Sequence, residues 1–253
     1  MSSSFDDELH SLKLSDDGSY TAYSKEYDEH YHSTKDGALK ESLVKHVIPA
    51  FSVVEKDEIN ILDICYGLGF NTLATVLYVK EHFPHKKINI YSPELDSSLV
   101  KSLVNFTYPD NFESIKDIIF ALSKDGIYND GQFSIEVFLG DARKYIKKFN
   151  NKFDIVYQDA FSPSVNPILW TKEYFSDIKS SMKEDAVLTT YSIAFRTRLA
   201  LYENGLNLYT NSGEEYRTAT VASAKILEDF DLVDMPHKIS CNKDIMSLRD
   251  EKI

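Results

Sequence analysis

The sequence has few of the residues that cross-link a chain or anchor it in a membrane. It contains only two cysteines, Cys65 and Cys241, which excludes a framework of several disulfides and indicates reduced thiols in a cytoplasmic protein. No charged-then-apolar segment opens the chain, and the longest apolar stretch, 59–79, is interrupted by Asp63 and by glycines. We therefore expect neither a secretory signal nor a membrane-spanning helix, and no membrane partner.

Positive charge and glycine are both scarce. The 28 Lys and Arg residues are outnumbered by 40 Asp and Glu residues, which gives a net charge of −12. This balance disfavours non-specific binding to nucleic acids or membranes, although it leaves room for a local basic face. With only nine glycines in the chain, the close pair Gly67 and Gly69 and the Gly140–Asp141 step indicate positions where the backbone has a specific task.

The composition is that of an ordinary globular protein, with 43% apolar and 27% charged residues in 253. Strand patterns alternate with helix patterns, which predicts a mostly parallel sheet with right-handed crossovers. The predicted strands are 59–65, 87–91, 134–139, 153–158 and 186–191, and the predicted helices are 71–82, 97–106, 112–122, 142–149, 171–182 and 195–204. Two further strand-like runs, 206–210 and 218–222, predict an antiparallel hairpin at the edge of the sheet.

The segments on either side of this alternation are predicted to be peripheral. Residues 1–15 resemble a frayed terminus, the tyrosine-rich segment 19–33 predicts a short hairpin, and 39–51 has helical spacing. The charged C-terminal segment predicts a tail or a peripheral helix. We therefore divide the chain into an N-terminal extension (1–55), a Rossmann-like core (56–223) and a C-terminal tail (224–253).

Ligands in such sheets bind at the carboxyl ends of the strands, near the point where the strand order reverses. The loop after the first strand, 66–71, contains Gly67 and Gly69, which let the backbone approach a ligand closely. Glu94 after the second strand can accept both ribose hydroxyls, and Asp141 after the third can accept an adenine amino group. Alone, each feature also fits a tight turn, a solvated acid or a helix cap. Together they predict an adenosine-bearing cofactor.

The fourth strand ends in the segment with the most functional signals. Asp159 follows a buried strand directly above the predicted crevice, and Pro163 and 166–167 stiffen the loop after it. We interpret Asp159 as a functional carboxylate, with a turn cap as the alternative, and Trp170 as a core residue.

These motifs, in this order, resemble the class I methyltransferases that use S-adenosylmethionine. In detail, the sequence resembles the methyltransferase domain of the MnmC family of tRNA-modifying enzymes. The glycine loop of that family corresponds to 66–71, its Gly-Asp step to 140–141, and its Asp-Gly-Phe-x-Pro-x-x-Asn-Pro-x-x-Trp stretch to 159–170. The resemblance covers about 20–222. Ala160 replaces a family glycine, and 214–217 holds fewer basic residues than the family has there.

The resemblance implies a Rossmann-like α/β fold: a mostly parallel seven-stranded sheet with an antiparallel C-terminal hairpin and an N-terminal β extension. It implies a stand-alone methyltransferase that uses S-adenosylmethionine and needs neither FAD nor a metal. The residues that we expect at the cofactor are Tyr66, Gly67, Gly69, Asn71, Glu94, Asp141, Ala142 and Asp159. Those that we expect at the substrate are Phe161, Pro163, Tyr191, Arg196 and Arg217. Asp159 is the expected catalytic residue, either as a base or as a group that orients an amine.

The implied acceptor is the primary amine of an aminomethyl-uridine at the wobble position of tRNA. An acidic chain that binds tRNA needs a local basic surface, because phosphate contacts dominate the affinity. The candidates are Arg196, Arg198, Arg217, Lys144, Lys147 and Lys148, unless these cations only balance the acidic surface. The sequence leaves open whether the protein is a monomer or a dimer.

Three alternatives remain on the same fold. Residues 140–143, Asp159 and 171–175 also resemble spermidine synthases, which are aminopropyltransferases, although the glycine-rich loop of that family is not matched by 66–69. A methyltransferase that acts on a small molecule is a second alternative. A non-catalytic interaction protein is a third, because a fold does not determine a function.

Overall fold

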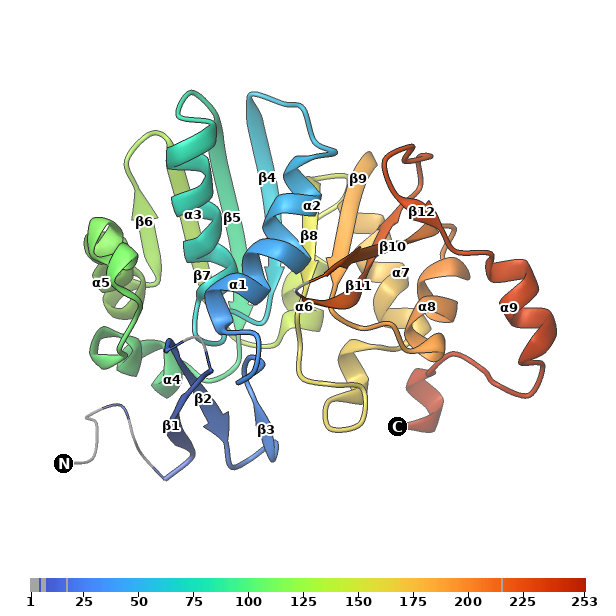
Figure 1. Cartoon of the computed structure of the whole chain (residues 1–253), viewed down its shortest axis with the longest axis horizontal. Helices are drawn as coiled ribbons and strands as arrows, with labels where there is room; N and C mark the ends of the chain where they lie inside the picture. The colour runs from blue at the N-terminus through green and yellow to red at the C-terminus, as the bar shows by residue number, and fades with distance from the viewer. Residues whose placement is uncertain (1–4, 6–7, 17, 215) are drawn as a thin grey trace.

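The computed structural model describes residues 5, 8–16, 18–214 and 216–253. A large sheet lies at its centre, with helices on both faces (Figure 1). The strands of this sheet are β4 (Glu58–Ile64), β5 (Lys87–Glu94), β6 (Ile127–Asn129), β7 (Phe133–Leu139), β8 (Phe153–Gln158), β9 (Met182–Thr190), β10 (Asn207–Gly213), β11 (Tyr216–Ser223) and β12 (Asp231–Leu232). They follow the order β12-β10-β11-β9-β8-β4-β5-β7-β6, so the order reverses between β4 and β8.

Strands β4, β5, β7, β8 and β9 are parallel to one another, which confirms the predicted Rossmann-like α/β fold. Over the described residues the sheet has nine strands rather than seven, because the short strands β6 and β12 extend its two edges. The predicted antiparallel hairpin forms from β10 and β11. Strand β11 is inserted between β9 and β10 and is antiparallel to both, so β10 runs in the same direction as β9. After β9 the chain thus skips one strand position when it forms β10, and β11, the second strand of the hairpin, occupies the skipped position.

Helices cover both faces of the sheet (Figure 1). One face carries α1 (Ala38–Ser42), the π-helical turn η1 (Leu43–Val47), α2 (Ile48–Phe51), α3 (Phe70–His82), α4 (Ser97–Ser102), η2 (Leu103–Asn105), η3 (Asp110–Ile115) and α5 (Lys116–Asp125). The other carries α6 (Ala142–Ile146), η4 (Pro167–Leu169), α7 (Lys172–Ser181) and α8 (Phe195–Tyr202). Helix α9 (Met235–Cys241) and η5 (Asp250–Lys252) follow near the C-terminus. In the described part of the chain, no helix is both long and apolar enough to cross a membrane.

The central strand β4 shows how the sequence builds the two cores. Ile59 and Ile61 belong to the core on the α3 face, whereas Leu62 and Ile64 belong to the core on the α7 face. Consecutive residues of a strand point to opposite faces, so a strand covered on both sides is apolar at almost every position. Asp63 breaks this pattern and is nevertheless buried.

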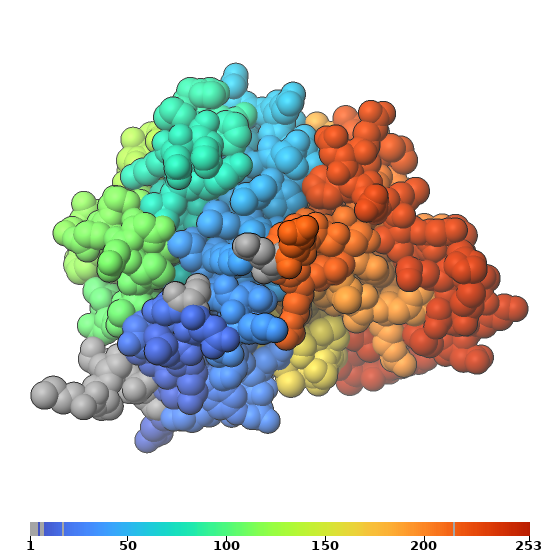
Figure 2. Space-filling model, viewed as in Figure 1, coloured from blue at the N-terminus to red at the C-terminus, as the bar shows by residue number. Residues whose placement is uncertain are grey.

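The N-terminal segment forms a small antiparallel sheet of β1 (His10–Leu14), β2 (Tyr20–Ser24) and β3 (Glu29–His30). The predicted hairpin at 19–33 is therefore confirmed. The expectation that 1–15 is frayed is wrong for His10–Leu14, which pairs along its length with β2; residues 1–4 and 6–7 lie outside the described part. This small sheet lies beside the carboxyl ends of β4, β5 and β8 (Figure 1). The loop after β8, yellow in Figure 2, reaches the surface between these blue strands and the orange-red C-terminal region.

The predicted helix at 39–51 forms, but it contains the π-helical turn η1. Pro49 lies two residues beyond this turn and has no N–H to donate; its ring would also collide with the carbonyl of Lys45 in a regular α-helix. A wider turn relieves this conflict, and such turns often occur at functional sites. As a result, Lys45 and His46 are both buried.

Candidate active site

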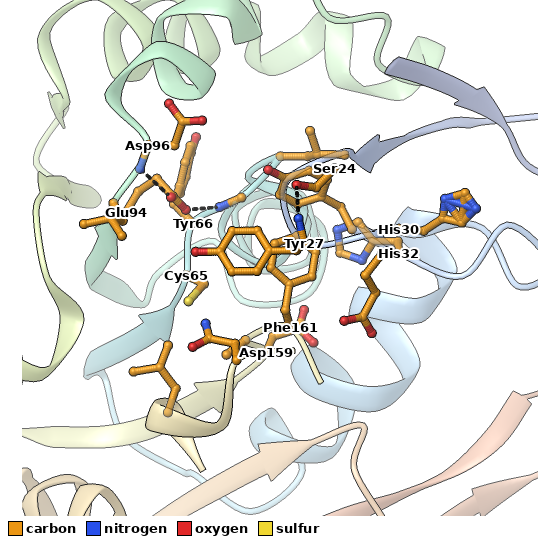
Figure 3. Close-up of a pocket in the computed structure, with 18 of the residues that line it drawn as sticks. Ser24, Tyr27, His30, His32, Cys65, Tyr66, Glu94, Asp96, Asp159 and Phe161 are labelled. Carbon is orange, nitrogen blue, oxygen red and sulfur yellow. Dashed lines mark hydrogen bonds between the residues drawn. The ribbon is translucent and has the colours of Figure 1, made fainter. Parts of the chain in front are cut away.

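A cavity of about 1030 Å³ lies at the carboxyl ends of β4, β5, β7 and β8, beneath the N-terminal sheet. Its walls come from the turn after β4, the ends of β5 and β7, the loop after β8, and the segment between β2 and α1. Figure 3 shows side chains from these distant segments converging on one space. The volume suits a nucleoside cofactor together with part of a second substrate.

The turn between β4 and α3 depends on its two glycines. Gly67 and Gly69 have φ angles of 54° and 78°, which are left-handed conformations that favour glycine. A Cβ atom at Gly69 would lie 2.7 Å from the hydroxyl oxygen of Tyr66, and one at Gly67 would lie 3.2 Å from the ring of Tyr31. The turn is therefore tight on both sides, and the backbone of Gly67 is left facing the cavity.

Glu94 connects the ends of β4 and β5. Its Oε2 accepts a hydrogen bond from the backbone N–H of Gly67 at 2.9 Å, and its Oε1 accepts one from Asp96 at 2.9 Å (Figure 3). Burial raises the pKa of Glu94 above its ordinary value, against the lowering effect of these hydrogen bonds. Each carboxylate oxygen keeps a second lone pair, so the held side chain can still accept a bond from a ligand.

Asp141 and Ala142 form the wall at the end of β7. Oδ1 of Asp141 accepts a hydrogen bond from the backbone N–H of Arg143 at 2.8 Å and so caps α6. Asp141 therefore is a helix cap and also lines the cavity.

Asp159 is held at both carboxylate oxygens. Nδ2 of Asn71 donates to Oδ2 at 2.8 Å, and Nε2 of His46 lies 3.4 Å from Oδ1. Burial alone would raise the pKa of Asp159, but the electrostatic interaction with His46 and its hydrogen bonds outweigh burial and lower it. The side chain is 14% exposed, and the residue lines the cavity. The site thus presents an ionised, oriented carboxylate to whatever occupies it.

A second carboxyl group, Asp63, lies behind Asp159. Thr72 Oγ1 donates to its Oδ2 at 2.7 Å, and Asn71 Nδ2 lies 3.5 Å from its Oδ1. Burial raises the pKa of Asp63 to about 7, and the negative charge of Asp159 acts in the same direction. The pKa values of these two acids are thus shifted in opposite directions, as in sites where one carboxyl group stays ionised beside a neutral one.

Most of the residues assigned from the sequence meet in this cavity. Those that line it are Tyr66, Gly67, Asn71, Glu94, Asp141, Ala142, Asp159, Phe161, Tyr191 and Arg217. Gly69, Pro163 and Arg196 lie outside the lining, where Gly69 shapes the glycine turn and Arg196 is exposed on α8. Trp170 is buried, as expected of a core residue, and its Nε1 donates to the carbonyl oxygen of Phe161 at 2.7 Å.

The N-terminal segment contributes site residues that the sequence analysis missed. Tyr27 stacks on Phe161 with ring centroids 4.7 Å apart, and Tyr31 packs against the same ring at 4.9 Å (Figure 3). His32 is buried and lines the cavity, and burial lowers its pKa. His46 was also missed; its Nε2 lies 3.4 Å from Oδ1 of Asp159. The spacing of residues within one segment does not indicate these contacts. The one such signal in the sequence was Asp63, a charged residue inside an otherwise apolar strand.

One of the residues expected on the basic surface is buried, whereas Lys144, Lys147, Lys148, Arg196 and Arg217 are exposed. Arg198 is only 8% exposed, and its Nε donates to Thr220 Oγ1, so the expectation that it contacts phosphate is wrong. Two residues along a helix are separated by about 200°, so Arg198 faces the sheet while Arg196 faces outward. Lys147 pairs with Asp177 at 3.4 Å, and Lys148 lies 4.2 Å from the centre of the Phe138 ring.

The charged groups of the cavity lining are mostly acidic. Its carboxyl groups belong to Glu26, Asp28, Glu29, Glu41, Glu94, Asp96, Asp141 and Asp159, against Lys35 and Arg217 as fixed cations. Such a lining favours ligands that carry positive charge or several hydrogen-bond donors. Across the described residues, no cluster of three or more His, Cys, Asp or Glu side chains is arranged to hold a metal ion.

Comparison with known proteins identifies several relatives. A family model described as S-adenosyl-L-methionine-dependent methyltransferase matches residues 118–225. The uncharacterized protein MJ0670 of Methanocaldococcus jannaschii is 33% identical over 201 residues, which cover 78% of this chain and 54% of that protein. The tRNA 5-methylaminomethyl-2-thiouridine biosynthesis bifunctional protein MnmC of Azoarcus sp. is 27% identical over 216 residues, which cover 78% of this chain and 33% of that protein. The chain therefore spans about half the length of the first relative and a third of the second.

Two solved structures are also similar. The spermidine synthase of Thermotoga maritima has a TM-score of 0.52 at 18% identity, over 95% of this chain and 80% of that one, which shows a shared fold alone. MnmC2 of Aquifex aeolicus has a TM-score of 0.82 at 33% identity and covers 98% of this chain and 80% of that one. Because this second match extends over nearly the whole chain at such identity, the chain belongs to the MnmC family of S-adenosyl-L-methionine-dependent methyltransferases.

Proposed function

We propose that this protein methylates the primary amine of an aminomethyl-modified wobble uridine in tRNA. The proposal rests on the environment of Asp159. Asn71 and His46 contact the two oxygens of this ionised carboxylate, which lies between the turn after β4 and the rings of Phe161 and Tyr191 in the cavity lining. A protonated or hydrogen-bonding amine is the natural partner of such a group. Relatives of this chain are named for tRNA 5-methylaminomethyl-2-thiouridine biosynthesis, whose product carries a methylated amine at this type of position.

The chemistry of the cavity fits S-adenosylmethionine. This ligand has ribose hydroxyls, an adenine amino group, an ammonium and a sulfonium, all of which suit a carboxylate-rich lining. We assign Glu94 to the ribose and Asp141 with Ala142 to the adenine. Tyr66, Gly67 and Gly69 form the turn that approaches the rest of the cofactor, with Asn71 and Asp159 next to it. When bound, S-adenosylmethionine supplies a methyl group that its sulfonium makes electrophilic.

The protein's part in the reaction is to align the amine and exclude water. An alkyl amine has a pKa of roughly 10, so it must lose a proton before it can attack. With S-adenosylmethionine bound, Asp159 would hold the neutral amine with its lone pair toward the methyl group, the donor would become the neutral thioether, and solvent would accept the protons that the amine and its methylated product release. The lowered pKa of Asp159 makes it a weak base, which favours a role in orienting the amine and stabilising its positive charge.

The opposite side of the cavity suits a nucleobase. A wobble base must leave its stack to reach Asp159, and Tyr191 lines the cavity as a ring against which it can stack. Tyr27 and Phe161 already stack on each other, so a base would meet the outer surface of this pair. Pro163 stiffens the loop that carries Phe161. Arg217 at the cavity and Arg196 outside it are exposed, which supports assigning them to phosphate contacts while the acidic interior receives only the base and its amine.

The test is methyl transfer from labelled donor onto bulk tRNA from a strain that lacks this modification. We expect label in tRNA, with incorporation that falls steeply as salt is added. The acidic lining also suits a polyamine, so an assay with putrescine and decarboxylated donor runs in parallel. Polyamine product with inert tRNA would establish the aminopropyltransferase alternative. A protein that bound neither S-adenosylmethionine nor its product would instead be a non-catalytic member of the fold.

A further inference from the structure

His46 lies directly behind the carboxylate to which the proposed function assigns the amine. Its side chain is fully buried, with 0% of its surface exposed. Nδ1 lies 3.0 Å from Thr189 Oγ1, and Nε2 lies 3.4 Å from Asp159 Oδ1. The ring also packs edge-on against Tyr157, with centroids 5.6 Å apart. Both ring nitrogens thus face oxygen atoms, one of which belongs to the carboxylate of the site.

The Thr189 hydroxyl can donate to Nδ1 or accept from it, depending on the protonation of the ring. When it donates, or when the ring carries both protons, Nε2 holds a proton that faces Asp159. Among the described residues Nε2 has no hydrogen-bond partner in this geometry, and the oxygen that it faces, at 3.4 Å, is Asp159 Oδ1. A buried N–H group without an acceptor costs free energy. The N–H group at Nε2 is therefore most favourable when it points toward Asp159 Oδ1.

Most of the remaining charged groups around this pair have other partners, although His32 also lowers the pKa of Asp159. Glu41 forms an ion pair with Lys45, and Asp63 accepts its hydrogen bond from Thr72. His32, whose pKa is lowered by burial, lies on the cavity side of Asp159, and the Tyr157 hydroxyl is paired with Thr75. His46 is thus the group that faces Oδ1 from the buried side, while Asn71 holds Oδ2.

We infer that His46 is a positioning residue that holds Asp159 ionised and in one orientation, so that the free lone pairs of the carboxylate point at the acceptor amine. The inference rests on the role given to Asp159 in the proposed function. His46 belongs to the π-helical turn η1, and turns of this kind often occur at functional sites.

Two substitutions separate the ring nitrogens. His46→Asn keeps an amide near the position of Nδ1, beside Thr189, and removes the group at Nε2. His46→Gln instead places an amide nitrogen near the position of Nε2. We expect His46→Asn to lower kcat between about tenfold and a hundredfold, with KM for the methyl donor within about twofold, because the displaced carboxylate no longer aligns the amine. In His46→Asn the acidic limb of the pH–rate profile should also move to higher pH. His46→Gln should instead keep most of the parental kcat and most of the parental pH–rate profile.

A double-mutant cycle with Asp159→Asn tests whether His46 acts through Asp159. We expect His46→Asn to have little further effect on kcat once Asp159 is replaced. A full additional loss in that background, or parental kcat in His46→Asn alone, would overturn the inference. Parental methyl transfer by Asp159→Asn itself would instead overturn the role of Asp159 in the proposed function.

A second readout needs no acceptor. The carboxyl carbon of Asp159 can be titrated by ¹³C NMR and assigned by the loss of its signal in Asp159→Asn. The pKa of Asp159 should lie below its ordinary value in the parental protein and rise in His46→Asn; an ordinary or raised value in the parental protein contradicts the inference even if no variant folds. Circular dichroism and calorimetry with S-adenosylhomocysteine show whether each variant is folded and keeps its cofactor site.

Discussion

Glu94 and Gly67 are joined by a hydrogen bond of 2.9 Å from the Gly67 backbone N–H to the Glu94 carboxylate, which connects the ends of β4 and β5. The bond ties the glycine turn to the acid that we assign to the ribose. Because Glu94 lines the cavity while it holds this turn, one side chain both shapes the site and remains available to a ligand.

Replacing Glu94 should therefore weaken cofactor binding. Glu94→Gln removes the charge from the group that would accept the ribose hydroxyls, and a hydrogen bond to a charged group contributes about 1.5–3 kcal/mol. We expect affinity for S-adenosylhomocysteine, measured by calorimetry, to fall at least tenfold. Glu58→Gln, at the opposite end of β4 and exposed, is the matched control and should bind normally. Equal affinity in both variants would remove Glu94 from the cofactor site.

Replacing Asp159 should affect transfer rather than cofactor binding. We expect Asp159→Ala to leave S-adenosylhomocysteine affinity within a few-fold and to lower methyl transfer by roughly a hundredfold or more, as for other groups that act on the reacting atoms. Single-turnover assays with labelled donor measure the rate, and calorimetry measures the affinity. A variant that methylates at the parental rate would contradict the role given to Asp159.

Asp63 should make stability depend on pH. Its folded pKa of about 7 lies above the ordinary value of 3.8, so between these values the folded state binds more protons than the unfolded state. The contribution of Asp63 to stability therefore decreases as pH rises through this window and is constant above it. Urea unfolding of Asp63→Asn and the parental protein, between about pH 5 and pH 8, should show the variant gaining relative stability as pH rises. A constant difference would argue against the raised pKa.

Gly69 should tolerate a side chain less well than another left-handed glycine. Gly205 has a φ of 79°, close to the 78° of Gly69, but a Cβ there would have nothing within 4 Å, whereas at Gly69 it would lie 2.7 Å from Tyr66. Gly205→Ala should cost about 1–2 kcal/mol of unfolding free energy through backbone strain alone. Gly69→Ala should cost clearly more, and equal losses in urea unfolding would mean that the turn can relax.

The exposed arginines should matter for tRNA and not for the cofactor. We expect Arg196→Ala with Arg217→Ala to weaken tRNA binding and to lower the slope of log affinity against log salt by about one to two units, since each lost phosphate contact removes roughly one released counterion. Filter binding over a salt series measures the slope. Lys101→Ala on α4 is the control cation. Unchanged slopes would place the tRNA surface elsewhere.

The sequence alone predicted the architecture and much of the proposed site. Alternating strand and helix patterns are local signals, and parallel strands necessarily bring their carboxyl ends to one edge. Glu94, Asp141 and Asp159 each follow a strand directly, so their convergence on one cavity required no knowledge of side-chain packing. Trp170 could likewise be expected in the core.

Only the tertiary structure decided what surrounds these acids. His46 reaches Asp159 because a π-helical turn and the packing of the N-terminal helices on the sheet rotate it inward, and Tyr27 meets Phe161 across two segments far apart in the chain. The burial of Arg198 and the insertion of β11 between β9 and β10 are also long-range outcomes. Such contacts depend on which surfaces meet when the whole chain is compact, and residue spacing within one segment carries no information about them.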